Sequence, residues 1–169
     1  MERRHFVASL RGARSRVHAL TFIREWSMPT RNASAIWEGG LQKGKGSFSG
    51  ASGKIGGTYS FGTRFGEEPG TNPEELLAAA EAACFSMALS LGLEQAGSPP
   101  TKIETKAACT VDKVGDGFAI TTMKLVVRAT VPGMSNDAFA KIAQATKDGC
   151  PVSKALKGNV KIEMDAELA

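Results

Sequence analysis

One segment of the 169-residue chain restricts its fold more than any other: between residues 76 and 93 the only charged side chain is Glu81. A helix start precedes this segment, because Asn72 can cap a helix and Pro73 suits the first helical position. A glycine followed by two prolines marks the end of the segment after Ala96. The pattern predicts one long helix that is apolar on nearly all of its faces.

A helix of this kind has to be covered on most sides. Its apolar stretch reaches the lower edge of the ~17–25 residues that cross a bilayer. However, Glu81, Ser86 and Ser90 dilute its hydrophobicity, and the flanking sequence is typical of strands in water-soluble proteins. We therefore favour a buried core helix. A chain of this length forms about one domain and can rarely surround such a helix alone, so we expect a second subunit to supply part of the cover.

The sequence on either side of the helix predicts strands. Short apolar pieces separated by glycines between residues 33 and 65 indicate two or three short strands. Apolar residues alternate at 103–111 and again at 119–131, with Gly115-Asp116-Gly117 between them, which predicts a hairpin. Strict alternation from Val160 to Leu168 predicts a last strand.

Two further helical elements lie between the hairpin and the last strand. A helix is expected from about Ser135 to Asp148, and Cys150-Pro151 opens a short helical turn. The resulting order, βββ-α-ββ-α-β, indicates an α+β fold in which helices pack on an antiparallel sheet.

The net charge of +4 lies entirely in residues 1–27, which hold six arginines against two acidic residues. The remaining sequence is balanced, so its charge gives no reason to expect nucleic acid or an anionic membrane as a partner. The Arg-rich segment lacks the apolar run of a secretory signal. It fits a targeting peptide, a dispensable extension, or a translation start assigned too far upstream of Met28. We favour the last of these interpretations. The expected organisation is an N-terminal extension at 1–27, expected to be disordered, and a folded domain at 28–169.

Both histidines also lie in the first 27 residues, so the expected folded domain contains none. This excludes Ser-His-Asp and Cys-His catalytic sites and any histidine-ligated metal centre there, and it disfavours a cofactorless hydrolase. Three cysteines remain, which are too few for a Cys₄ zinc site, and no CxxC motif is present. Without a secretion signal we expect a reducing compartment, where a cysteine pair tends to be catalytic or redox-sensing.

Each cysteine has both a structural and a chemical interpretation. Cys84 lies in the middle of the long helix, where it can be a small core residue. By spacing it shares a stripe, expected to be buried, with Leu77, Ala80, Met87 and Leu91. Cys109 faces inward on a strand, and a core role is favoured there. Cys150 stands at a helix start, where backbone N–H groups favour a thiolate, and an ordinary capping role is the alternative.

A thiolate at Cys84 needs a nearby cation, because this residue lies too far into its helix for the helix dipole to act. A free cysteine has a pKa of ~8.5, and lowering that pKa by one unit requires about 1.4 kcal/mol of additional thiolate stabilisation. Arg64, between aromatic residues just before the helix, is a candidate cation. A partly buried arginine needs a carboxylate partner, for which Glu74 is the natural candidate. The alternative interpretation is that Arg64 is an ordinary surface arginine and Glu74 a simple acidic residue at the helix end.

Four motifs, in order and with compatible spacing, resemble the OsmC/Ohr family, which comprises osmotically inducible protein C and the organic hydroperoxide resistance proteins. They are Phe-Gly-Thr-Arg-Phe at 61–65, Gly-Thr-Asn-Pro-Glu-Glu-Leu at 70–76, Ala-Ala-Cys-Phe-Ser-Met-Ala-Leu-Ser at 82–90 and Gly-Cys-Pro-Val-Ser at 149–153. The chain is most similar to the OsmC branch. The resemblance extends from about residue 30 onward, whereas residues 1–27 have no counterpart in it.

The resemblance implies an OsmC-like α+β fold around a long buried central helix, and a thiol-dependent peroxidase that needs no metal or organic cofactor. It assigns Cys84 as the peroxidatic thiolate and Cys150 as the cysteine that resolves it in a Cys84–Cys150 disulfide. It also implies that Arg64 and Glu74 orient and activate Cys84. Cys109 matches no functional position of the family and keeps its core interpretation.

The resemblance further implies an intertwined homodimer with two active sites at the subunit interface, which agrees with the need to cover the long helix. Organic hydroperoxides, and more weakly hydrogen peroxide, are the expected substrates. A dithiol, for example a lipoyl protein, is the expected reductant, and defence against oxidative and osmotic stress in the cytoplasm is the expected role. The alternative is a non-catalytic redox sensor or stress-binding protein that uses the same cysteine pair.

Overall fold

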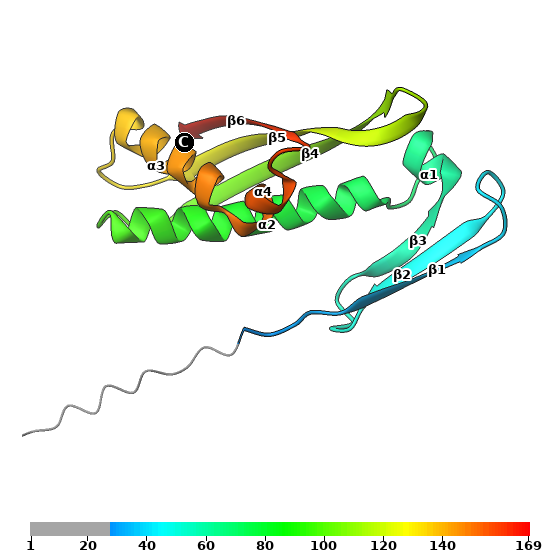
Figure 1. The fold of residues 1–169 in the computed structure, drawn as a ribbon. Coiled ribbons are helices and arrows are strands. Elements are labelled where there is room, and N and C mark those ends of the chain that lie inside the picture. Colours follow the sequence, from blue (N-terminus) through cyan, green and yellow to red (C-terminus); the bar gives the residue numbers. More distant parts are fainter. Residues whose placement is uncertain (1–27) are drawn as a thin grey trace, which may run out of the picture. The chain divides into compact units, whose positions relative to one another are not determined.

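The structure is a computed structural model that describes residues 28–169. In chain order its elements are β1 (Ala33–Glu38), β2 (Lys45–Gly50), β3 (Gly56–Ser60), α1 (Phe61–Phe65), α2 (Pro73–Gln95), β4 (Lys102–Val114), β5 (Gly117–Thr130), α3 (Asn136–Gly149), α4 (Pro151–Leu156) and β6 (Lys161–Leu168). The strands form two separate three-stranded sheets, β1–β2–β3 and β4–β5–β6 (Figure 1). The predicted α+β class is confirmed. The extension expected at 1–27 lies outside the described residues, so that boundary stays a prediction.

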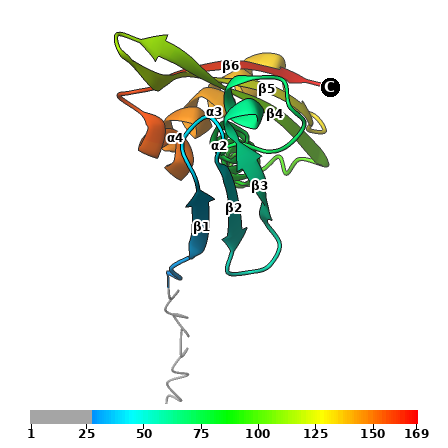
Figure 2. The same ribbon diagram turned by 90° about the vertical axis from the view of Figure 1, so that its right-hand side faces the viewer.

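The first sheet is an antiparallel meander of three short strands, as the glycine-separated apolar pieces predicted (Figure 2). Aromatic rings lie directly over its backbone: the Trp37 and Tyr59 ring centroids are 5.4 Å apart. Gly46 is buried beside both rings, and a Cβ at this position would collide with the Tyr59 ring. Glycine is therefore needed at residue 46 because of the close approach of these rings.

Helix α1 corrects the prediction that residues 61–65 continue the short strands. Ser60 and Thr63 cap it reciprocally: the Thr63 N–H donates to Ser60 Oγ at 3.1 Å, and the Ser60 N–H donates to Thr63 Oγ1 at 2.9 Å. This local capping outweighs the strand preference of the aromatic residues. The Phe65 ring then packs on Phe118, with 4.8 Å between centroids, so Arg64 is presented by a helical turn.

Helix α2 begins and ends where the sequence predicted. The Asn72 side chain accepts a hydrogen bond from the Glu75 N–H at 2.8 Å, and Pro73 occupies the first helical position. Gly97, with φ at +78°, follows the last turn in the left-handed conformation that glycine adopts without strain. The capping residues therefore fix the length of the helix that carries Cys84.

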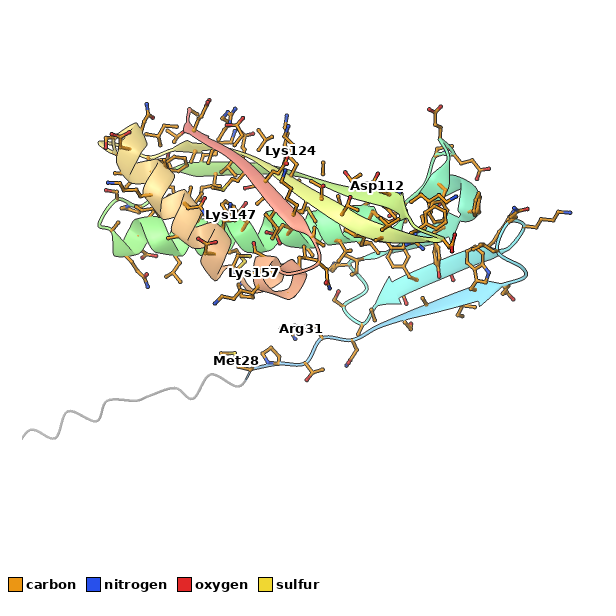
Figure 3. The ribbon with its side chains drawn as sticks, turned by 45° about the horizontal axis from the view of Figure 1, so that its top comes forward. Met28, Arg31, Asp112, Lys124, Lys147 and Lys157 are labelled. Atoms are coloured by element: carbon orange, nitrogen blue, oxygen red, sulfur yellow. The ribbon has the colours of Figure 1, made fainter. Side chains whose placement is uncertain are left out.

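The second sheet is mixed, whereas an antiparallel sheet was predicted. Strands β4 and β5 form the expected antiparallel hairpin, but β6 pairs with β5 in parallel. Alternation shows which residues of a strand face the core and not which way the strand runs. The connection through α3 and α4 is the kind of long crossover that parallel strands require. Exposed side chains such as Lys124 stand on the outer face of this sheet (Figure 3).

The core lies where α2 and α3 cover the inner face of the β4–β5–β6 sheet (Figure 1). Helix α2 contributes Phe85, Leu89 and Leu93, which are each 0% exposed. The prediction that the stripe containing Cys84 is buried is wrong for the single chain: Met87 is 76% exposed and Leu91 is 54% exposed. Because the helix is apolar all round, its sequence periodicity could not indicate which side the sheet covers.

By length and composition alone, α2 is also the one helix among the described residues that could span a membrane. A core helix of a soluble protein has the same properties, and α2 packs its face at residues 85, 89 and 93 against β5 and α3 in the hydrophobic core. The packing supports the prediction that it is a core helix.

We expect Phe85→Ala to lower the free energy of unfolding by about 3–5 kcal/mol, because it leaves a cavity among fully buried side chains. Lys141→Ala, at an exposed position of α3, is the control and should change it by less than about 0.5 kcal/mol. Urea unfolding of both variants at low protein concentration measures the difference. Equal costs would contradict the assignment of the buried face.

Candidate active site

The structure brings together two of the four residues that the sequence resemblance placed in the active site. Cys84 on α2 and Cys150, the residue before α4, have their Sγ atoms 3.2 Å apart. Cys150 is 0% exposed, and its backbone N–H donates to the Thr146 carbonyl at 2.8 Å, which fixes the start of α4. Both are free thiols. Because their sulfurs touch, a disulfide could close with little movement of either backbone.

Cys84 is partly buried, and its surroundings favour the neutral thiol within one chain. Burial raises the pKa of Cys84 above its ordinary value, while the backbone N–H of Val152 acts in the opposite direction. The neighbouring Cys150 and Glu81 raise the pKa of Cys84 further. Among residues 28–169 no cation contributes to the pKa of Cys84, so these residues of one chain do not by themselves favour a thiolate at Cys84.

Arg64 and Glu74 form the ion pair that the sequence suggested. The Arg64 Nη2 atom lies 2.8 Å from Glu74 Oε1, and Arg64 Nε lies 3.2 Å from the same oxygen. The Glu74 side chain is only 7% exposed, whereas that of Arg64 is 37% exposed. The guanidinium also stands over the Phe65 ring, 5.0 Å from its centroid. The pair holds the arginine in one orientation with part of its surface still open.

Arg64 and Cys84 are not brought together within one chain. Glu74, which holds Arg64, lies ten residues before Cys84 on α2, which corresponds to a rise of about 15 Å. Within residues 28–169 the hydrogen-bond partner of the Arg64 guanidinium is Glu74, and neither thiol is bonded to it. The candidate site therefore consists of two separate pairs, Arg64–Glu74 and Cys84–Cys150.

A third pair of polar residues lies near the two cysteines. The sequence alone did not predict this pair. Ser153 Oγ donates to Glu81 Oε1 at 2.5 Å, and both residues are buried. Two signals were present in the sequence: Glu81 is the one charge in the long apolar segment, and Ser153 ends the Gly-Cys-Pro-Val-Ser motif. Spacing along the chain could not show that these two residues meet.

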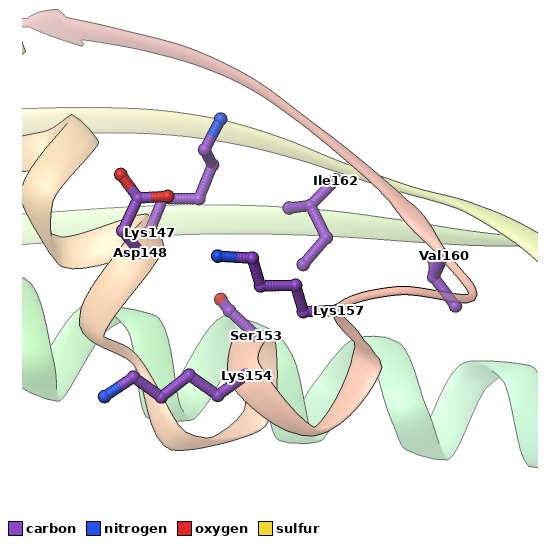
Figure 4. Close-up of a pocket in the computed structure, with 7 residues that line it drawn as sticks. All are labelled: Lys147, Asp148, Ser153, Lys154, Lys157, Val160 and Ile162. Carbon is purple, nitrogen blue, oxygen red and sulfur yellow. The ribbon is translucent and has the colours of Figure 1, made fainter.

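Arg64 opens onto a groove of about 720 Å³, a size typical of ligand pockets. Its lining combines the apolar side chains of Val111, Phe118, Ala119, Ile120 and Val160 with the polar residues Arg64 and Asn159. A smaller cavity of about 180 Å³ lies beside α4, between the end of α3 and the start of β6 (Figure 4). It is lined by Lys147, Asp148, Ser153, Lys154, Lys157, Val160 and Ile162.

Cys109 lies apart from the other two cysteines, on β4 opposite Met123. It is partly buried and packs against the hydrophobic core, in agreement with its predicted core role. Burial, and secondarily the charge of Glu74, raises the pKa of Cys109, which favours its neutral thiol form. Among residues 28–169, no three His, Cys, Asp or Glu side chains are grouped so that they could hold a metal ion.

Comparison with known proteins places this fold and these motifs in a family. Residues 66–165 match the sequence model of the family described as OsmC-like protein. Peroxiredoxin OsmC of Escherichia coli is 49% identical over 134 residues, which cover 79% of this chain and 94% of that protein. Organic hydroperoxide resistance protein OhrB of Bacillus subtilis is 34% identical over 99 residues, covering 58% of this chain and 71% of that protein.

Solved structures agree at the level of the fold. The crystal structure of OhrB of Bacillus subtilis matches with a TM-score of 0.62 at 26% identity, covering 80% of this chain and 98% of that one. An organic hydroperoxide resistance protein from Elizabethkingia anophelis matches with a TM-score of 0.68 at 21% identity, covering 85% and 100%. The family model matches more than half of this chain, and the chain is 49% identical to a relative of which it covers 94%. The chain therefore belongs to the OsmC-like protein family.

Proposed function

We propose that this protein is a cysteine-based peroxidase that reduces organic hydroperoxides, and more weakly hydrogen peroxide, in defence against peroxide stress. The observation that carries the proposal is the 3.2 Å contact between Cys84 Sγ and Cys150 Sγ, in a chain 49% identical to a protein named peroxiredoxin OsmC. Several further relatives are named organic hydroperoxide resistance proteins. The cysteine pair supplies both the nucleophile and the resolving group that such a reaction needs.

In the first step the Cys84 thiolate attacks the peroxide oxygen farther from the organic group. The O–O bond breaks, the sulfur is oxidised to a sulfenic acid, and the peroxide is reduced to an alcohol. The leaving alkoxide takes up the proton that Cys84 gave up, so that thiol and hydroperoxide become sulfenic acid and alcohol. A guanidinium beside the sulfur stabilises both the thiolate and the negative charge on the leaving oxygen.

In the second step the Cys150 sulfur attacks the sulfenic sulfur of Cys84. The S–O bond breaks, the Cys150 proton leaves with the hydroxyl group as water, and the Cys84–Cys150 disulfide forms. The sulfurs have to approach from 3.2 Å to the ~2.05 Å of a disulfide, a shift of about 1 Å. An external dithiol, for example on a lipoyl protein, then reduces the disulfide by thiol–disulfide exchange and restores both thiols.

The surroundings of Arg64 support organic rather than inorganic hydroperoxides as substrates. The guanidinium faces a groove whose other lining side chains include Val111, Phe118 and Ile120. Such apolar side chains bind the hydrocarbon tail of an organic hydroperoxide by removing it from water. Hydrogen peroxide has no apolar part and gains no affinity from them. The arginine is then placed at the polar, reacting end of the substrate.

A second copy of the chain would complete the site. Ala80, Met87 and Leu91 leave an apolar stripe of α2 exposed, and this stripe adjoins Cys84 on the helix. An exposed apolar face of a long helix is typical of an interface. We propose that a homodimer covers it and that Arg64 of one protomer reaches Cys84 of its partner. The cation would then lower the pKa of Cys84, which the single chain raises.

We further propose that the protein works in the cytoplasm, where thiol reductants keep the cysteine pair reduced between turnovers. The residues 1–27 are proposed to be dispensable for this activity.

A non-catalytic sensor using the same cysteines would be oxidised once per chain, so multiple turnover is the property that separates the two functions.

Cys84→Ser should abolish the consumption of cumene hydroperoxide in the presence of dithiothreitol, because it removes the attacking sulfur. Cys150→Ser should allow Cys84 to reduce one equivalent, after which no intramolecular disulfide forms. Cys109→Ser is the matched control and should keep normal turnover. Peptide mapping of the oxidised protein should find a Cys84–Cys150 disulfide. Turnover by Cys84→Ser, or a disulfide at Cys109, would refute these assignments, and a single oxidation of the wild type would indicate a sensor.

Arg64→Met should lower the rate at pH 7 by about 10²–10³-fold, because the thiolate and leaving oxygen lose their cation. The same activity should return partly when this variant is mixed and re-equilibrated with Cys84→Ser. A mixed dimer would then contain one site with an intact Cys84 and an intact Arg64 from the other chain. Recovery shows that arginine acts across the interface, whereas the absence of recovery, with mixed dimers verified by mass spectrometry, places it within one chain.

Met87→Glu should shift the protein from dimer to monomer, because a charge in the centre of the apolar stripe is costly to bury. Sedimentation velocity measures the shift, and peroxidase activity should fall with the dimer fraction. Ala140→Glu, on the exposed side of α3, is the control and should leave the oligomeric state unchanged. A Met87→Glu protein that stays dimeric would show that the stripe is not the interface.

A further inference from the structure

The proposed peroxidase chemistry does not use the pair Glu81 and Ser153, yet the two are among the most deeply buried polar residues described. Glu81 is 0% exposed and Ser153 is 2% exposed. Ser153 Oγ donates to Glu81 Oε1 at 2.5 Å, while Glu81 Oε2 has no hydrogen-bond partner within residues 28–169. Burying a carboxyl group with an unpaired oxygen costs stability, and an apolar side chain of similar size would avoid that cost. Stability of the fold therefore does not explain a glutamate at residue 81.

The position of the pair points to a role beside the cysteines. Glu81 lies one helical turn before Cys84 on α2, and Ser153 lies one turn after Cys150, on α4. Residues three apart share a face of a helix. The Glu81–Ser153 hydrogen bond and the Cys84–Cys150 sulfur contact therefore join the same two helices side by side.

Helix α4 has few other polar interactions that could hold it on α2. It is six residues long, and Cys150, its N-cap, makes no side-chain capping bond. Toward the cavity of Figure 4 it presents the flexible side chains of Lys154 and Lys157. Within the described residues, Ser153 is the α4 residue whose side chain forms a hydrogen bond to α2.

We propose that Glu81 is a positioning residue that, by accepting the Ser153 hydrogen bond, fixes α4 on α2 and keeps Cys150 aligned with Cys84 for the resolving step. This inference deepens the proposed peroxidase function and, as a statement about the resolving step, rests on it. The alignment of the two thiols is, however, measurable without any peroxide. Misplacing reacting groups by about 1 Å can cost 10²-fold in rate. A sulfenic acid that waits for its partner is also open to further, irreversible oxidation by a second peroxide.

Four variants test the role of Glu81. Glu81→Leu removes the acceptor and keeps a similar volume, and Ser153→Ala removes the donor. Glu81→Gln keeps an acceptor oxygen at the same place. Thr105→Val is the matched control, because Thr105 accepts a 2.8 Å bond from Ser86 that joins α2 to β4 and not to α4. Ser153→Ala leaves the buried glutamate without a partner, so Glu81→Leu carries the test if Ser153→Ala fails to fold.

The first measurement is the equilibrium of the thiol pair with glutathione, which reports how well Cys84 and Cys150 are aligned. Glu81→Leu and Ser153→Ala should lower the effective concentration of one thiol at the other about tenfold. For this two-electron couple, a tenfold change corresponds to a shift of ~30 mV in the reduction potential of the cysteine pair. Glu81→Gln and Thr105→Val should stay within about twofold of the wild type. A wild-type value in folded Glu81→Leu, or an equal loss in Thr105→Val, overturns the proposal.

The second measurement uses one equivalent of cumene hydroperoxide and traps the Cys84 sulfenic acid with dimedone. In Glu81→Leu and Ser153→Ala the sulfenic acid should persist about ten times longer, while the initial loss of hydroperoxide changes by less than about threefold. Unchanged lifetimes refute a role in resolution. If the wild type consumes no hydroperoxide but the glutathione equilibrium shifts as expected, the peroxidase proposal fails and the positioning role of Glu81 on the thiol pair is supported.

Discussion

Helix α2 is apolar on every side, and a single sheet can cover only one of them. The face at residues 85, 89 and 93 packs into the core, and the face at Ala80, Met87 and Leu91 is left in solvent. Cys84 belongs to this second, open face, and it is partly buried with its sulfur against Cys150. The position of the proposed nucleophile thus follows from the incomplete cover of the helix. A thiol in the covered face would be unreachable, whereas Cys84 on the open face contacts Cys150, its proposed resolving partner.

The two buried carboxyl groups of α2 connect this helix to different elements. Glu74 in the first turn holds Arg64 of α1, and Glu81 a little further along holds Ser153 of α4. Each connection places one group for the proposed chemistry: a cation through the first, and the resolving thiol through the second. The apolar helix serves as a rigid support on which two polar contacts, spaced along its axis, set the arrangement of the site.

Those features of the fold and of the candidate site that depend on local chemistry could be predicted from the sequence. The cap at Asn72, the alternation along β6 and the pairing of Arg64 with Glu74 depend on neighbouring residues or on a charge that needs a partner. The resemblance to a family, and not spacing, predicted the pairing of Cys84 with Cys150.

Other features depend on contacts that sequence patterns do not contain. They include the parallel direction of β6, the covered side of α2 and the meeting of Glu81 with Ser153. Each is decided by packing between elements far apart in the chain, where several local patterns are equally compatible with the residues.

The parallel pairing of β6 with β5 has a consequence for how the redox state is detected. Because β6 returns beside β5, Cys150 sits inside a crossover whose two ends are both fixed in the sheet. Its backbone is bonded to Thr146 on one side, and Ser153 anchors the other. A segment fixed in this way does not swing out as a free loop would, so we expect the dithiol form and the proposed disulfide form to have almost the same outline. A partner protein that distinguishes the two forms would then have to sense the sulfur chemistry itself, since the overall shape would carry almost no record of oxidation.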